Sequence, residues 1–183
     1  MRDLSAFQRR QAAKVLLTRI SEAYGHMILR EGLFQADCHP GNILVMKGGK
    51  VGLIDFGQSK QLTTEEVDAF ARLVVAATEP RADAGQVAQA VWDLGIVTGR
   101  TDDGIKEVVA RMAWDMFDTR GTVDPFSPNS PLKQTSIDVF PRDFFFVLRT
   151  CQLLRGLKER MEIDESWSSL ERWRGLARKR LAS

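Results

Sequence analysis

The fold is decided by residues 33–57, which read LFQADCHPGNILVMKGGKVGLIDFG. Two short apolar runs rich in strand-forming residues, 43–46 and 51–54, flank the pair Gly48-Gly49. Glycine tolerates the positive φ that tight hairpin turns require. The stretch therefore predicts a strand and a loop, followed by a β-hairpin that ends in an acidic motif.

Three polar residues bracket this hairpin, namely Asp37, Asn42 and Asp55. The first two have the D-x-x-x-x-N spacing of a kinase catalytic loop, and Asp55 begins D-F-G, the magnesium-binding sequence of kinases. Phosphoryl transfer concentrates negative charge on a triphosphate, so oxygen ligands must hold a divalent metal. The pattern predicts that Asn42 and Asp55 bind Mg²⁺ and, through it, ATP. Asp37 is predicted to accept the proton of the attacking hydroxyl or to orient that hydroxyl.

A purely structural interpretation of these residues is also open. In it, Asp37 and Asn42 form an Asx-turn and Asp55 caps the segment that follows. Each motif alone is unspecific, but both together on either side of a hairpin favour the catalytic interpretation.

The segment resembles the UbiB-type atypical kinases, also called aarF-domain or activity-of-bc-one-complex kinases, through the residues QADCHPGNILV and VGLIDFGQSKQLTTEE. The resemblance continues through 140–156 and covers essentially the whole chain. It implies a kinase-like fold, the use of ATP with Mg²⁺, and a link to isoprenoid-quinone or lipid metabolism in a mitochondrion, a plastid or the bacterial cytoplasm. It also implies that Asp37 is the catalytic aspartate and that Asn42 and Asp55 are the metal ligands.

His39 is the second candidate catalytic residue. It occupies the loop position where protein kinases place a phosphate-contacting lysine. Because histidine is readily protonated near neutral pH, it could donate to the transferred phosphoryl group. The alternative is a histidine that hydrogen-bonds the loop backbone.

The motif D-x-H-P-x-N is also similar to small-molecule phosphotransferases of the aminoglycoside and choline kinase type. Those enzymes usually have a histidine where this chain has Gln35. The residues after D-F-G, Gln58-Ser59 and Leu62, also fit the UbiB-type pattern better. A small-molecule phosphotransferase is therefore the second interpretation.

The chain contains no A-P-E sequence of the kind that ends a protein-kinase activation segment. Instead, Thr63 and Glu66 form a capping box that begins a helix shortly after Gly57. This leaves little room for a peptide-docking platform. We therefore expect the substrate to be a small molecule or a lipid.

Helical periodicity dominates the remainder, which predicts a mostly helical α+β fold with the architecture of a kinase carboxy-terminal lobe. Gly32 is expected to end the first helix, and Pro141 to lie in a first helical turn. The predicted helices are 4–30, 65–78, 83–94, 101–117 and 144–157, and 121–136 is a predicted loop.

The carboxy-terminal segment 166–181 combines tryptophans with basic residues. One interpretation is an amphipathic helix that lies on an anionic membrane as a peripheral contact. The other is a final helix whose tryptophans pack on the core while its basic residues face water. The residues concerned are Trp167, Trp173, Arg172, Arg174, Arg178, Lys179 and Arg180.

Composition limits the classes of function. The chain has 183 residues, 44% of them hydrophobic, and a formal net charge of +2. These values indicate one folded domain and give no reason to expect nucleic acid as a partner. No run of residues is apolar and long enough for a transmembrane segment. Cys38 and Cys151 match no metal or disulfide framework.

A kinase-type site also needs a phosphate-covering loop and a strand lysine, and the sequence supplies neither. We therefore expect 1–183 to correspond to a kinase-like carboxy-terminal lobe without the amino-terminal lobe. Its parts would be 1–62, with the catalytic loop, and the helical subdomain 63–183. Such a lobe would be impaired in isolation, so a non-catalytic binding module is the third interpretation. The expected partners are a nucleotide and a lipid or a component of a prenylquinone pathway.

Overall fold

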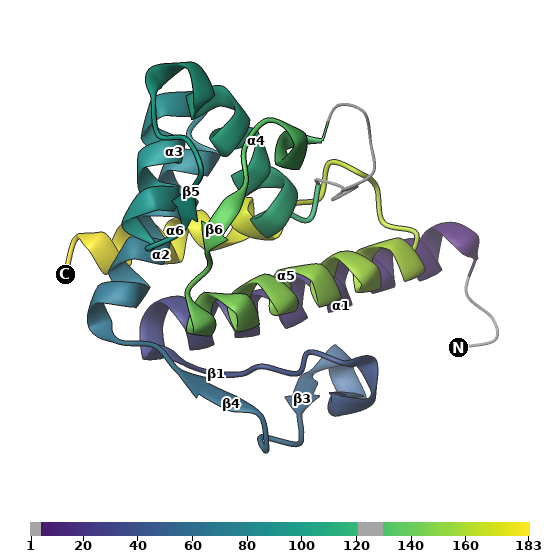
Figure 1. Cartoon of the computed structure of the whole chain (residues 1–183). Coiled ribbons are helices and arrows are strands. Elements are labelled where there is room, and N and C mark those ends of the chain that lie inside the picture. The colour runs from purple at the N-terminus through teal and green to yellow at the C-terminus, as the bar shows by residue number, and fades with distance from the viewer. Residues whose placement is uncertain (1–4, 121–129) are drawn as a thin grey trace.

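The computed structural model describes residues 5–120 and 130–183 and is mostly helical, with small antiparallel sheets (Figure 1). This confirms the predicted α+β class. The helices are α1 Ala6–His26, α2 Thr64–Thr78, α3 Ala84–Asp93, α4 Lys106–Phe117, α5 Arg142–Arg160 and α6 Ser169–Leu181. The strands are β1 Leu33–Gln35, β2 Ile43–Val45, β3 Val51–Leu53, β4 Ser59–Gln61, β5 Val97–Thr98 and β6 Ile137–Val139.

The first predicted helix is present. Ser5 caps α1 with a capping box, and the helix continues beyond His26 as a π-helical segment, Met27–Glu31. Gly32 ends it with φ 66°, in the left-handed region that glycine enters without steric cost. The first residue of the prediction, Leu4, lies outside the described residues.

The predicted hairpin is also present. Strands β2 and β3 pair antiparallel, with Ile43 opposite Leu53. Gly48 and Gly49 both have positive φ, 77° and 71°, as the turn prediction requires. The Arg19 side chain, from α1, donates to the carbonyl oxygens of both glycines. The turn is thereby joined to the first helix.

A second pair of strands surrounds the loop. β1 pairs antiparallel with β4, and Gln35 lies opposite Ser59. The segment between these two strands, 36–58, therefore begins and ends at the same place. Figure 1 shows this segment and the hairpin on one side of α1 and α5, while α2, α3, α4 and α6 lie on the other. Strand β4 was not predicted from the sequence.

Most helix predictions agree with the structure within a few residues. The predicted capping box between Thr63 and Glu66 is formed in both directions. Pro141 is the N-cap residue of α5 and not part of its first turn, which corrects the prediction. Of the predicted loop 121–136, residues 121–129 lie outside the described residues, and Pro131–Lys133 forms a short 3₁₀-helix.

The core is built around α6. Trp173 is fully buried, and its indole nitrogen donates to the Ser21 carbonyl oxygen of α1 at 2.7 Å. Its ring meets Phe70 of α2 edge to face, with the ring centroids 6.3 Å apart. Trp167, just before α6, is also buried. Both tryptophans are therefore part of the core, as the core-packing interpretation predicts.

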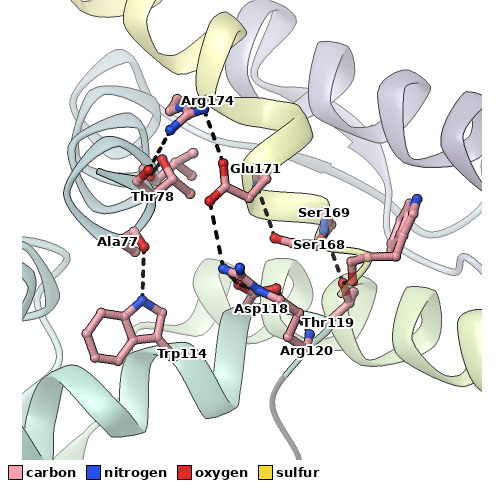
Figure 2. Close-up of polar contacts among 12 residues, drawn as sticks. Ala77, Thr78, Trp114, Asp118, Thr119, Arg120, Ser168, Ser169, Glu171 and Arg174 are labelled. Carbon is pink, nitrogen blue, oxygen red and sulfur yellow. Dashed lines mark hydrogen bonds and ion pairs between the residues drawn. The ribbon is translucent and has the colours of Figure 1, made fainter. Parts of the chain in front are cut away.

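Arg172, Arg178 and Lys179 are exposed to water, as that interpretation predicts, but several basic residues of α6 also make contacts with α2. Arg174 donates to the Thr78 carbonyl oxygen at the end of α2, at 2.6 Å, and pairs with Glu171 (Figure 2). Arg178 pairs with Glu79 at 2.6 Å, and Arg180 with Asp68 at 2.7 Å. These contacts fasten α6 to α2. Contact of α6 with a membrane remains an untested prediction.

The helix ends that meet α6 are capped by side chains as well. In Figure 2 the Trp114 indole of α4 donates to the Ala77 carbonyl oxygen of α2, at 3.0 Å. Arg120 pairs with the buried Asp118 carboxylate at 2.6 Å. Buried helix ends need such partners because their last carbonyl groups have none within the helix.

In the described part of the chain, no helix is long and apolar enough to cross a membrane.

Candidate active site

The carboxylate of Asp37 lies in the loop after β1 and is held by two donors. The side-chain nitrogen of Asn42 donates to its Oδ2 at 3.0 Å and to the Asp37 carbonyl oxygen at 3.2 Å. The Nη2 of Arg149, on α5, donates to its Oδ1 at 2.8 Å. Since each oxygen has its own donor, the carboxylate is fixed in orientation while its side chain stays 24% exposed.

Asn42 and Asp55 meet at one end of the hairpin. The amide of Ile54 donates to the Asn42 carbonyl oxygen at 3.0 Å, which extends the β2–β3 pairing by one step. Asp55 is the next residue, so its backbone follows directly on the residue paired with Asn42. The hairpin thus places the backbones of the two predicted ligands at neighbouring positions. The side-chain amide of Asn42 also joins Asp37 to this end of the hairpin.

Gln35 connects this end of the hairpin to the core. Its side chain is fully buried, and its Nε2 donates to the carbonyl oxygens of Ile54 and Asp55, both at 3.2 Å. Its Oε1 accepts from the hydroxyl of Tyr24, on α1. The backbone of Asp55 is therefore tethered to the first helix through one glutamine.

Asp55 has a left-handed backbone, with φ 60°. Aspartate enters this region more readily than most residues, because its short side chain bonds locally. Here Oδ1 accepts from the Gly57 amide at 3.1 Å. This is the kind of local contact that the structural interpretation predicts for Asp55. It uses one carboxylate oxygen and leaves Oδ2 without a contact to the described residues.

His39 is turned toward its own loop. Its Nδ1 accepts from the Gly41 amide at 3.1 Å, and its carbonyl oxygen accepts from the Asn42 amide at 2.8 Å. The imidazole thus makes the backbone hydrogen bond of the second interpretation. The Nδ1 atom is therefore occupied by the backbone of its own loop.

The oxygen atoms of Asn42 and Asp55 are of the kind that binds a hard cation shared with a phosphate ligand. Asn42 uses its amide nitrogen toward Asp37, which leaves the amide oxygen as an acceptor. Together with Asp55 Oδ2, this supplies two oxygen atoms at one end of the hairpin. Mg²⁺ is commonly bound by one or two carboxylates together with waters and substrate phosphates. Among the described residues, no group of three or more His, Cys, Asp or Glu side chains forms a self-sufficient metal site.

The interior beside the loop is apolar and holds its titratable groups neutral. Cys38, next to Asp37, is fully buried, and burial raises the pKa of its thiol to about 12. Burial also raises the pKa of the Tyr24 phenol, with the nearby Cys38 as a further cause. Cys38 is thus a protonated filler beneath the loop and not a nucleophile.

Two residues of this site lie outside the predicted set. In the sequence, Gln35 differs from the histidine that another family has at this position. In the structure it is a buried polar residue two positions before Asp37, which indicates a hydrogen-bonded role. Arg149 reaches Asp37 from α5, more than a hundred residues along the chain. No local pattern signals such a contact.

Comparison with known proteins identifies the segment that carries these residues. Residues 1–91 match the family model described as the ABC1 atypical kinase-like domain. These residues belong to the ABC1 atypical kinase-like family. The match confirms the resemblance derived from the loop and hairpin. All four predicted site residues lie inside the ABC1 segment, and Arg149 lies outside it.

One curated relative extends the ABC1 similarity beyond the matched domain. The protein named Protein ACTIVITY OF BC1 COMPLEX KINASE 1, chloroplastic, from Arabidopsis thaliana is 35% identical over 136 residues. The alignment covers 71% of this chain and 20% of that protein. The chain thus spans about a fifth of the length of the relative it matches. No solved structure matches the chain significantly.

Proposed function

We propose that this chain carries the catalytic-loop and metal-binding side of an ATP- and Mg²⁺-dependent phosphotransferase or ATPase of the ABC1 kind. The observation that carries the proposal is the grouping at one end of the hairpin: Asn42 bonded to the Asp37 carboxylate, with Asp55 following the residue paired with Asn42. This grouping has the composition that phosphoryl transfer needs, two oxygen ligands and one oriented carboxylate.

Each residue has a role in the proposed reaction. The acceptor oxygen forms a bond to the γ-phosphorus while the bond from that phosphorus to the bridging oxygen of ADP breaks. Asp37 accepts or orients the acceptor's proton, and for an ATPase the acceptor is water. Asn42 and Asp55 would hold Mg²⁺, which neutralises charge on the phosphates. His39 supports the loop through its bond to Gly41, and we propose this positioning role in place of direct catalysis.

We further propose that the acceptor is a small molecule or a lipid. The support is the short connection after D-F-G: β4 begins at Ser59 and α2 at Thr64, so a peptide-docking segment has no room there. The family resemblance adds isoprenoid-quinone or lipid metabolism as the setting. The name of the Arabidopsis relative contains the word chloroplastic, which favours an organelle as the location.

The test is thermal stabilisation by Mg²⁺ and ATP. Ligand at ten times its Kd stabilises the folded chain by about 1.4 kcal/mol, which raises Tm by roughly 3–5 °C for a chain of this size. Asp55→Asn should abolish the shift. Asparagine tolerates the left-handed backbone and keeps the acceptor for the Gly57 amide, so only the charge is lost.

Asp102→Asn is the control, because Asp102 Oδ1 also accepts from the amide two residues further on, that of Gly104, at 3.1 Å, although its own backbone is extended. This variant should keep the full shift. Absence of any Mg²⁺-dependent ATP shift in the unmodified chain would contradict the proposed function and favour a binding module. An equal shift in Asp55→Asn would contradict the role of Asp55.

A further inference from the structure

Arg149 is the cationic side chain that bonds the Asp37 carboxylate. It projects from α5, and its Nη2 lies 2.8 Å from Asp37 Oδ1. Its Nη1 donates to Gln58 Oε1 at 3.4 Å, immediately after the D-F-G sequence. The guanidinium therefore spans the two segments that the proposed phosphoryl transfer uses, the catalytic loop and the end of the acidic motif.

The ion pair between Arg149 and Asp37 contributes little to the stability of the fold. The Arg149 side chain is 40% exposed and that of Asp37 24% exposed. Pairs this accessible to water contribute about 0–1 kcal/mol, because solvent screens the attraction and both side chains lose freedom. Asp37 is also oriented without Arg149, through the Asn42 amide on its other oxygen.

Within the catalytic loop, the candidate for contacting the phosphate was His39, and its Nδ1 is occupied by the Gly41 amide. Phosphoryl transfer requires a positive group beside the transferred phosphate, to stabilise the charge that spreads over its oxygens. A guanidinium suits this task because it is always charged and can contact two phosphate oxygens at once.

We propose that Arg149 is a phosphate-binding residue of this site and contacts the terminal phosphate of bound ATP. The inference rests on the proposed function. Its contacts to Asp37 and Gln58 use fewer N–H groups than a guanidinium carries, so donors remain for a ligand. The Arg149 side chain is 40% exposed, so a ligand in solution can approach it.

Titration calorimetry on the full chain with Mg²⁺–ATP and Mg²⁺–ADP tests this role. Arg149→Gln should weaken Mg²⁺–ATP binding about tenfold or more, the effect of losing a charge-assisted contact. Mg²⁺–ADP, which lacks the terminal phosphate, should lose less than about threefold. Arg149→Lys should recover part of the ATP affinity, because the charge is kept. Arg178→Gln, which removes an exposed ion pair on α6, is the control and should bind both like the unmodified chain.

A second measurement needs no variant. The ¹⁵N resonance of the Arg149 Nε group in the unmodified chain should shift when Mg²⁺–ATP is added and much less with Mg²⁺–ADP. An unmoved resonance, or an unchanged ATP affinity in Arg149→Gln, would overturn the Arg149 assignment and leave the proposed function standing. Equal losses for ATP and ADP would mean that Arg149 acts only through Asp37 and would also overturn it. Failure of the unmodified chain to bind either nucleotide would overturn both proposals.

Discussion

Gln35 is the residue whose replacement most directly tests how the site is held. Gln35→Leu keeps a side chain of similar size but removes its contacts to Tyr24, Ile54 and Asp55. The Tyr24 hydroxyl is then buried without this partner, which costs about 1–3 kcal/mol. The two carbonyl oxygens are only partly buried, and each adds up to about 1 kcal/mol. We therefore expect the free energy of unfolding to fall by about 2–4 kcal/mol.

Urea unfolding followed by far-UV circular dichroism measures this loss. With a urea m-value of about 2 kcal/mol per molar, the midpoint should fall by about 1–2 M. Tyr24→Phe in the Gln35→Leu background should recover part of the loss, because replacing both partners by apolar groups leaves no buried group unpaired. Gln61→Leu is the control, since this exposed glutamine bonds only the neighbouring Leu62 carbonyl oxygen. It should change stability by less than about 0.5 kcal/mol.

The reasoning would be refuted by either of two results. One is a decrease of less than about 1 kcal/mol in the free energy of unfolding of Gln35→Leu, which would mean that the contacts of Gln35 do not stabilise the fold. The other is strict additivity in the double variant with Tyr24→Phe, which would mean that the two side chains do not depend on each other. Gln35→Leu should also reduce the Mg²⁺–ATP thermal shift, because the backbone of Asp55 loses its anchor.

Three further predictions concern the scaffold. Gly25→Ala should lower the free energy of unfolding by about 1–3 kcal/mol in a urea titration, because the added Cβ would clash with Trp173 Cδ1. A stability equal to that of the unmodified chain would refute this contact. Thr63→Ala should cost about 1 kcal/mol through the lost cap of α2, by the same assay, and a change near zero would count against it. The Lys14 ammonium holds the pKa of Asp164 at about 2, so its NMR titration midpoint should lie there and rise in Lys14→Met. Because the pKa of Asp164 is depressed from about 3.9, its ionised carboxylate stabilises the folded chain fully above pH 4, and this stabilisation is lost as the pH falls through 2. An Asp164 titration midpoint that does not change in Lys14→Met would contradict the pairing.

Local signals in the sequence predicted the parts of the fold that depend on neighbouring residues. Gly32 ends the first helix and Gly48-Gly49 forms the hairpin turn because their positive φ angles are properties of the residue type. The box of Thr63 and Glu66 is likewise formed within one helical turn. The strand pairing of β1 with β4 was missed, because such short strands carry no periodicity and their pairing is set by the packing around them.

The basic residues of α6 mark the limit of such patterns. The alternation of tryptophan and arginine is equally compatible with a membrane surface and with a final core helix. Burial of Trp173 against Ser21 and Phe70 decides the place of the tryptophans. Whether Arg178 finds Glu79 as a partner depends on where α2 ends, and no pattern within α6 contains that information.

The sequence by itself determined the family segment, the hairpin and the order of Asp37, Asn42 and Asp55 along it, because a short loop and a tight turn bring such residues together without help from the rest of the chain. Only the tertiary structure decided what surrounds them. Gln35 connects Asp55 to α1, and Arg149 approaches Asp37 from α5. Both contacts depend on helices packing against one another, and packing joins residues whose separation in the chain carries no periodic signal.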